Sequence, residues 1–152
     1  MIATLALVLA VNGTHPRPNT FLADFGGAWS CAAPGQPASR WEISSAPGSR
    51  WVRVDWGIDP VTGVAGGTAY VAHVAALDKW VYRDFHGDGA YADLTSDGPQ
   101  GGVWEWTGPY YPYEGGTLEG HVQWKRSDAT HITRTFIPET GPRSGDLCTL
   151  TS

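Results

Sequence analysis

The stretch Asp24-Phe25-Gly26-Gly27-Ala28-Trp29 decides the fold, because it opens the first strand-like run of the chain. Gly27 lets a neighbouring backbone approach closely, and Trp29 on the same side of the strand presents a large apolar ring. Two interpretations follow. Either Trp29 fills one end of a β-barrel, or it is one core tryptophan among the eight of the chain.

The composition is typical of an all-β domain with many turns. The 152 residues suffice for one domain with a sizeable core, and they include eight Trp, six Tyr, twenty Gly and eleven Pro. Aromatic residues suit pleated sheets, whereas Gly and Pro interrupt them. The formal net charge of −5 and the lack of a basic stripe argue against nucleic acid as a partner.

The first residues have the character of an export signal. Residues 2–11 form an uncharged, apolar run that is too short to cross a bilayer as a helix and has the length of a signal-peptide core. We therefore expect residues 1–20 to be a leader and linker, and residues 21–152 to form the domain of a secreted or periplasmic protein without a membrane segment in its mature chain. The alternative is that the apolar run is a buried element of the fold.

Period-two alternation predicts ten short strands, with little helix beyond the leader. Turn residues such as Gly87-Asp88-Gly89 separate the strands. Strands joined by hairpins form an up-and-down meander, and closure removes its exposed edges, so we predict an antiparallel β-barrel of about eight to ten strands. The expected strands are Gly27–Ala32, Arg40–Ser45, Trp51–Trp56, Thr68–Ala75, Lys79–Phe85, Ala90–Thr95, Val103–Thr107, Thr117–Lys125, His131–Ile137 and Asp146–Leu150.

The two cysteines lie on the first and last of these strands. Cys31 follows Trp29 by two positions, and Cys148 lies four residues before the C-terminal residue. First and last strands are neighbours in a closed meander, so we predict a Cys31–Cys148 disulfide and an oxidising compartment. Two free buried thiols are the alternative. A metal site is not expected, since no second Cys pair or suitably spaced His accompanies them.

Strand parity places an arginine inside the barrel. Val122 and Trp124 alternate with polar residues, which indicates an apolar inner face and a wet outer face. On the next strand Arg134 shares a side with Ile132 and Phe136. We therefore expect Arg134 to point inward.

Gly27-x-Trp29, the inward Arg134 and the repeated Gly-aromatic hairpins resemble the lipocalin-like, or calycin, β-barrels, in particular small exported bacterial domains. The resemblance implies that the Arg134 guanidinium packs across Trp29, a favourable cation–π pair. The alternative role for Arg134 is to bind a ligand carboxylate inside the cavity.

Nitrobindin-like barrels, which bind haem, are an equally fair comparison. We expect no cofactor, and haem is the alternative that this comparison raises. Its ligand would be His73, His121 or His131, of which His121 and His131 face outward by parity.

Aromatic side chains mark the expected binding site. Stacked in a barrel, they would line a pocket for a flat apolar or amphipathic molecule, although a solidly packed aromatic core is an equal interpretation. Residues 108–116, whose Pro and Gly should keep them out of the sheet, would present tyrosines at the rim as a lid or a plug. The expected ligand-binding residues are Tyr70, Trp80, Tyr82, Trp104, Trp106, Trp124, Arg134 and Tyr111.

No catalytic or metal-binding motif stands out. The chain has no Gly-x-Ser-x-Gly elbow, phosphate loop or His-Glu-x-x-His, and the calcium-like start Asp84–Gly89 has His86 in place of an oxygen ligand. We therefore expect an exported barrel that binds a small hydrophobic or aromatic molecule. One alternative is a carbohydrate-binding module with Trp and Tyr platforms. The other is an isomerase- or cyclase-type enzyme whose cavity transfers protons through one of four carboxylates. These are Asp55, Asp84, Asp93 and Glu105.

Overall fold

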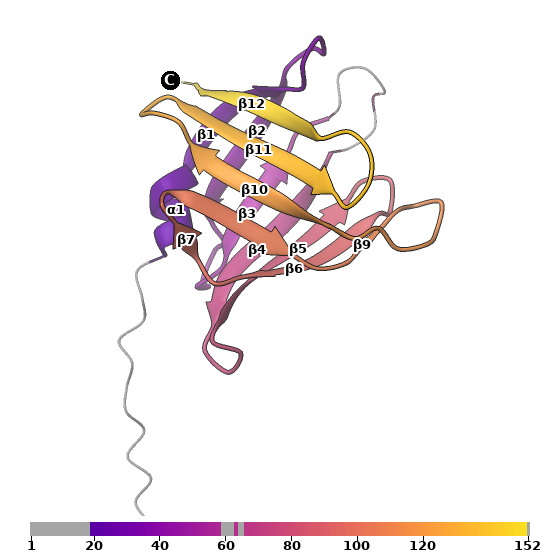
Figure 1. The fold of residues 1–152 in the computed structure, drawn as a ribbon. Coiled ribbons are helices and arrows are strands. Elements are labelled where there is room, and N and C mark those ends of the chain that lie inside the picture. Colours follow the sequence, from indigo (N-terminus) through magenta and orange to yellow (C-terminus); the bar gives the residue numbers. More distant parts are fainter. Residues whose placement is uncertain (1–18, 59–62, 64–65, 152) are drawn as a thin grey trace, which may run out of the picture.

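The protein is a closed antiparallel β-barrel in a computed structural model that describes residues 19–58, 63 and 66–151 (Figure 1). Each strand of the barrel pairs with its neighbours in chain order, β12 pairs with β1, and a β6–β8 pairing closes the ring. Within the described residues the barrel consists of ten strands: β1 (Gly27–Ala32), β2 (Ser39–Ser45), β3 (Val52–Trp56), β4 (Gly67–Val74), β5 (Lys79–His86), β6 (Tyr91–Ser96), β8 (Val103–Thr107), β10 (Gly120–Arg126), β11 (His131–Pro138) and β12 (Ser144–Leu150).

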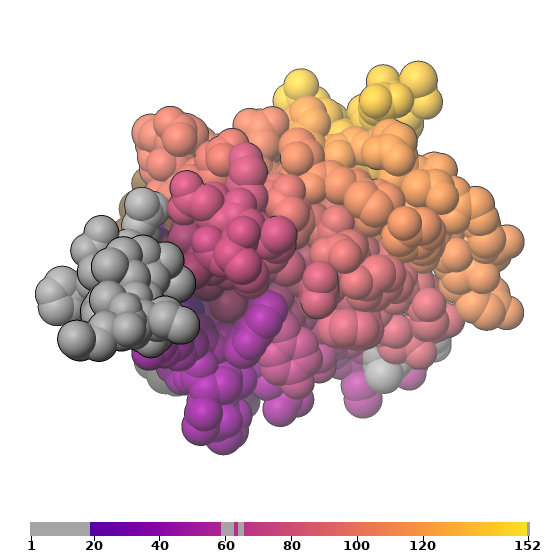
Figure 2. Space-filling view, turned by 90° about the horizontal axis from the view of Figure 1, so that it is seen from below, coloured from indigo at the N-terminus to yellow at the C-terminus, as the bar shows by residue number. Residues whose placement is uncertain are grey.

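All ten expected strands are present, which confirms the predicted fold class. Seen from below, violet residues of the first strands lie on the side of the molecule opposite the yellow residues of the C-terminal segment (Figure 2). Three short elements were not predicted, namely the helix α1 (Thr20–Phe25) and the two-residue strands β7 (Pro99–Gln100) and β9 (Tyr110–Tyr111). The expected leader falls almost wholly on residues 1–18, which lie outside the described residues.

Helix α1 fills one end of the barrel, which we call the closed end. The Asn19 side chain caps it by accepting a hydrogen bond from the Leu22 N–H, and Phe21 and Phe25 are fully buried. Phe21 meets Trp104, Trp106 and Trp124 edge-on, with ring centroids 5.3, 5.8 and 5.6 Å away. The barrel is therefore packed at this end by aromatic rings from helix and strands together.

Trp29 lies in this closed end, as the first interpretation predicted. Its indole N–H donates to the Phe25 carbonyl at 2.8 Å, which ties strand β1 to the last residue of α1. The Trp104 indole N–H donates to the Asp24 carboxylate at 2.7 Å, which ties β8 to the same helix. Both bonds satisfy polar atoms that would otherwise be buried without partners.

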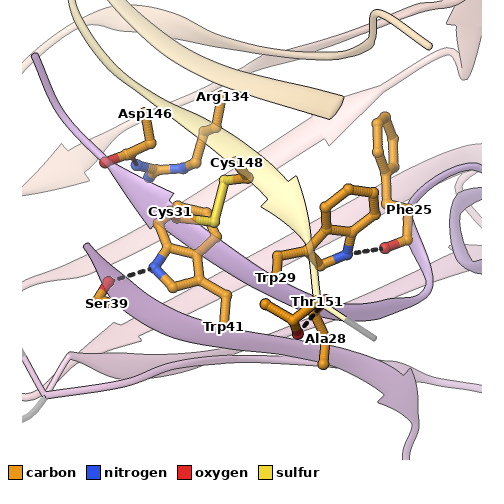
Figure 3. Close-up of a disulfide and its surroundings, with 10 residues drawn as sticks. All are labelled: Phe25, Ala28, Trp29, Cys31, Ser39, Trp41, Arg134, Asp146, Cys148 and Thr151. Carbon is orange, nitrogen blue, oxygen red and sulfur yellow. Dashed lines mark hydrogen bonds and ion pairs between the residues drawn. A yellow bond between two sulfur atoms is a disulfide. The ribbon is translucent and has the colours of Figure 1, made fainter. Parts of the chain in front are cut away.

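The expected stacking of Arg134 on Trp29 is wrong, and Arg126 takes that place. The Arg126 guanidinium carbon lies 5.8 Å from the Trp29 ring centre, whereas that of Arg134 lies 5.4 Å from the ring centre of Trp56. Strand parity correctly predicts that Arg134 faces the barrel interior. It does not predict the position of that side chain along the barrel axis. Figure 3 shows Arg134 beside Asp146, on the far side of the disulfide from Trp29 and Phe25.

The predicted disulfide is confirmed. Cys31 and Cys148 are direct partners across β1 and β12, with Cα atoms 3.9 Å apart and a bond between their sulfurs (Figure 3). Beyond β12 the Thr151 N–H donates to the Ala28 carbonyl at 2.8 Å. The first and last strands are thus joined covalently and by hydrogen bonds.

Two residues of the segment 108–116 join the sheet, which corrects in part the expectation that Pro and Gly exclude it. Tyr110 and Tyr111 pair with Ala92 and Tyr91 of β6. Pro109 is compatible with this ladder because it accepts a hydrogen bond through its carbonyl, from the Asp93 N–H at 3.2 Å. Gly108 has a φ of +148°, and a Cβ there would lie 2.3 Å from the Asp93 carbonyl oxygen, so only glycine fits.

Candidate functional site

A cavity of about 210 Å³ lies at the barrel end opposite α1, which we call the open end. Its lining residues come from β5, β6, β9, β10, β11 and β12, and from Gly108 between β8 and β9. Ligand pockets for drug-sized molecules typically measure about 300–1,000 Å³, so this cavity suits a smaller molecule. Its lining consists of Asp84, His86, Ala92, Leu94, Gly108, Tyr110, Gly120, Val122, Arg134, Phe136 and Ser144.

The polar side of the cavity is a cluster of charged side chains. Alternation along β5 turns Asp84 and His86 inward, and the His86 Nε2 atom lies 2.9 Å from the Asp84 Oδ2 atom. Arg134 reaches Asp84 from β11, with 3.8 Å between its Nη2 atom and the Asp84 Oδ2 atom. Its Nη1 atom lies 3.8 Å from Asp146 Oδ2, on the neighbouring residue of β12.

Burial and neighbouring charges together set the pKa values in this cluster. Burial disfavours the charge of Arg134, but the adjacent Tyr82, Asp84 and Asp146 outweigh it and raise its pKa, so the guanidinium stays protonated. Burial raises the pKa of the Asp146 carboxyl, and Arg134 only partly opposes that shift. Burial, reinforced by the Asp84 carboxylate, raises the pKa of Tyr82 well above its ordinary value.

Three polar atoms of the cluster are buried and without a hydrogen-bond partner among the described residues. They are the Tyr82 hydroxyl oxygen, Asp84 Oδ1 and Arg134 Nε. Asp84 itself is only 1 % exposed. Buried polar groups in folded proteins are nearly always paired, so Asp84 and Arg134, which line the cavity, keep hydrogen-bonding capacity, whereas Tyr82 lies outside the lining.

The other side of the cavity is apolar and aromatic. The rings of Tyr110 and Phe136 lie 6.3 Å apart, and the Tyr110 ring also meets His86 edge-on at 5.6 Å. His86 in turn stacks on Trp56 at 5.8 Å with an interplanar angle of 23°. The cavity thus offers ring surfaces on one side and charged groups on the other, an arrangement that suits an amphipathic ring molecule.

Five of the eight expected binding residues lie elsewhere in the barrel, in a solid aromatic cluster. All are buried, Trp104 stacks on Trp106 at 5.6 Å, and Tyr82 packs on Trp106 at 5.2 Å. Helix α1 contributes to this cluster, because Phe21 and Phe25 pack against Trp104 and Trp124. The five are Trp80, Tyr82, Trp104, Trp106 and Trp124.

The remaining three expected residues divide between the two faces of the barrel. Arg134 lines the cavity. Tyr70 is paired with the half-exposed Arg83, and Tyr111 is 42 % exposed, so both lie on the outer face. The sequence reasoning missed His86, Tyr110 and Phe136 as cavity residues. His86 has the same parity as Tyr82, so it would have been predicted to face the interior if the expected strand had extended one residue beyond Phe85.

Of the four carboxylates expected for a proton-transfer enzyme, Asp84 faces the cavity. The other three lie on the outer face, each beside a basic neighbour. Asp55 contacts Arg53 at 2.9 Å, Asp93 contacts Arg83 at 3.3 Å, and Glu105 contacts His121 at 3.3 Å.

Haem does not fit this cavity. The volume is small for a porphyrin, and none of the three expected histidines lines it; the histidine that does, His86, has its Nε2 atom 2.9 Å from Asp84. His73, His121 and His131 each lie beside a carboxylate instead, at 3.5, 3.3 and 2.9 Å. The calcium-like segment forms a hairpin turn, in which the Asp88 side chain accepts a hydrogen bond from the Ala90 N–H at 2.9 Å. In the described residues no group of three or more His, Cys, Asp or Glu is placed to hold a metal ion.

Fold and site together define a small closed antiparallel barrel with one packed end and one end that holds a cavity. The chain matches no family model and no curated protein sequence. Across the described residues, no helix has both the length and the apolar character needed to span a membrane.

Proposed function

We propose that the protein is an exported, lipocalin-like barrel that binds a small aromatic molecule at its open end. The observation that carries this proposal is the cavity beside Arg134, which combines ring surfaces with buried polar atoms that lack partners. Arg134 remains a binding residue in this proposal, as the sequence indicated. In this proposal the tryptophan cluster packs the barrel interior, and Tyr110 and Phe136 are the aromatic residues that contact the ligand.

The disulfide supports the exported location. Cys31 and Cys148 form a structural disulfide. Disulfides of this kind form and persist in oxidising compartments. A secreted or periplasmic protein would meet small molecules from its surroundings, which agrees with a binding role.

The test is calorimetric titration of the purified protein with a panel of one-ring aromatic compounds. We expect at least one compound to bind, and Phe136→Ala to weaken its binding by about 1–3 kcal/mol, as for a central contact. Two neighbouring tyrosines supply a matched pair. Tyr110→Ala should weaken binding because Tyr110 lines the cavity, whereas Tyr111→Ala should not, because Tyr111 lies outside. A panel without a single binder would refute the proposal.

A row of three aromatic rings on the outer face, two of them exposed and the middle one half-buried, favours carbohydrate binding as a second candidate function. Phe85, Tyr91 and Tyr111 are neighbours across β5, β6 and β9, with centroids 5.3 and 6.0 Å apart. The Tyr91 and Tyr111 rings are within 15° of parallel, and exposed near-parallel rings suit the flat faces of sugars. If polysaccharides retard the protein in affinity electrophoresis, Tyr111→Ala should abolish that retardation and leave cavity binding intact.

A further inference from the structure

Arg134 is a hydrogen-bond donor with capacity that the two carboxylates beside it leave unused. A guanidinium has five N–H donors in a planar fork. The Nε atom has no partner among the described residues, and both carboxylates lie 3.8 Å from the terminal nitrogens, which is beyond hydrogen-bond distance. Because Arg134 lines the cavity and its side chain keeps 19 % exposure, a ligand atom that accepts hydrogen bonds would meet the terminal N–H groups of the guanidinium there.

The charge around Arg134 disfavours an anion as that acceptor. Asp84 and Asp146 both contact the single guanidinium, so two carboxylates share one positive charge. A ligand carboxylate close enough to bind Arg134 would also lie close to both aspartates. Repulsion between like charges at such distances is substantial in a partly buried site, so it offsets the attraction of the arginine.

The same cluster also disfavours a cationic ligand, because the Arg134 guanidinium would repel it. Such a ligand would be drawn toward Asp84 and Asp146, but the guanidinium lies between them and His86 already contacts Asp84. A neutral carbonyl oxygen avoids both problems because it accepts hydrogen bonds from Arg134 without bringing a net charge. The apolar lining around Tyr110 and Phe136 then receives a ring attached to that carbonyl.

We infer that the cavity selects neutral aromatic carbonyl compounds, such as a one-ring ketone, ester or amide, over the corresponding carboxylates. This inference rests on the proposed function. It assigns the carbonyl oxygen to the Arg134 guanidinium and the ring to the side of Tyr110 and Phe136.

The experiment compares four one-ring probes of nearly equal size by calorimetry at pH 7. Acetophenone is neutral with a carbonyl, benzoate is an anion, benzamidine is a cation, and ethylbenzene is apolar. We expect acetophenone to bind about tenfold more tightly than each of the others, in line with one net hydrogen bond to a charged donor. Tighter binding of benzoate or benzamidine, or equal binding of ethylbenzene, would overturn the inference while leaving the proposed function in place. If none of the four binds and the wider panel also fails, the proposed function itself is wrong.

A variant tests the role of the flanking charge. Asp146→Asn removes one carboxylate beside Arg134, so the affinity for benzoate relative to acetophenone should rise by about tenfold. Asp93→Asn is the matched control, because Asp93 pairs with Arg83 on the outer face and should leave the ratio unchanged. A ratio that Asp146→Asn leaves unchanged would show that the aspartates do not exclude the anion.

Discussion

Arg126 joins three parts of the closed end through one side chain. Its Nη1 atom donates to the Asp24 carbonyl at 2.6 Å, its Nε and Nη2 atoms donate to carbonyls of the β10–β11 turn at 2.9 and 2.6 Å, and its guanidinium lies over Trp29. Helix, turn and first strand are therefore held by the same group.

We predict that Arg126→Ala lowers the free energy of unfolding by about 2–3 kcal/mol, since it removes charged hydrogen bonds and a cation–π contact together. Chemical denaturation followed by tryptophan fluorescence measures this loss. Arg40→Ala is the control, because Arg40 is exposed and makes one 3.8 Å surface ion pair, and its effect should stay within about 0.5 kcal/mol. Equal effects of the two variants would show that Arg126 is only a surface residue.

The Asp146 carboxyl is predicted to cost stability at neutral pH. Burial raises its pKa above the ordinary value of 3.8, so the folded protein binds its proton more tightly than the unfolded chain does. Its contribution to stability is therefore complete below pH 3.8 and is lost as the pH rises through the higher folded pKa. Asp146→Asn should raise the melting temperature at pH 7, and the difference from wild type should shrink as the pH falls toward 3. Thermal melts of both proteins across this range measure it, and a difference that grows on acidification would contradict the sign.

At the scale of elements, the closure of the barrel between β6 and β8, which we call the seam, depends on one glycine. Gly108 lets the chain pass from β8 to β9 while the backbone touches Asp93. We predict that Gly108→Ala destabilises the fold by more than about 1 kcal/mol beyond the ordinary cost of a side chain at positive φ. Gly115→Ala is the matched control, because Gly115 also has a positive φ, +95°, but no atom lies within 4 Å of its added Cβ. Hydrogen exchange of the Asp93 amide, which donates across the seam, should accelerate in the Gly108 variant alone.

The disulfide between β1 and β12 restrains the unfolded chain. It links residues 117 positions apart. Closing a loop of about that length stabilises a fold by on the order of 4–5 kcal/mol in the chain-entropy model, although measured values are often smaller. The Cys31→Ala/Cys148→Ala variant should therefore melt well below the oxidised protein, and wild type under reducing conditions should move toward the variant. Identical melting of oxidised protein and variant would contradict the prediction.

At the scale of the whole molecule, stability and binding occupy opposite ends of the barrel. Phe21→Ala removes the ring at the centre of the closed end and should cost about 3–5 kcal/mol of stability. Ligand affinity of the folded variant should remain that of wild type, because the cavity shares none of its lining with α1. Calorimetry below the melting temperature tests this, and a parallel loss of affinity would show that the two ends are coupled.

The barrel could be predicted from the sequence because strand alternation and turn residues are local signals. Gly27–Ala32 and Val103–Thr107 have the same bounds in prediction and structure. What failed depends on distant parts of the chain. Parity turned Arg134 inward but could not tell it from Arg126 as the partner of Trp29, and it could not show that Phe21 would pack against Trp104 and Trp124. Asp84 and His86 become a site only through contact with a residue of β11.

The position of the disulfide determines how the barrel responds to force. α1 and the end of β12 lie at the same end of the barrel, where Trp29 faces Leu150 across the ladder. Tension applied at Asn19 and Thr151 would first break the hydrogen bond between Thr151 and Ala28 and then separate β1 from β12 from Leu150 onward. The Cys31–Cys148 bond, two residues further on, would stop the separation. Such a load never reaches the open end. The protein can therefore be tethered to a surface through either of these residues with its cavity pointing away from the attachment.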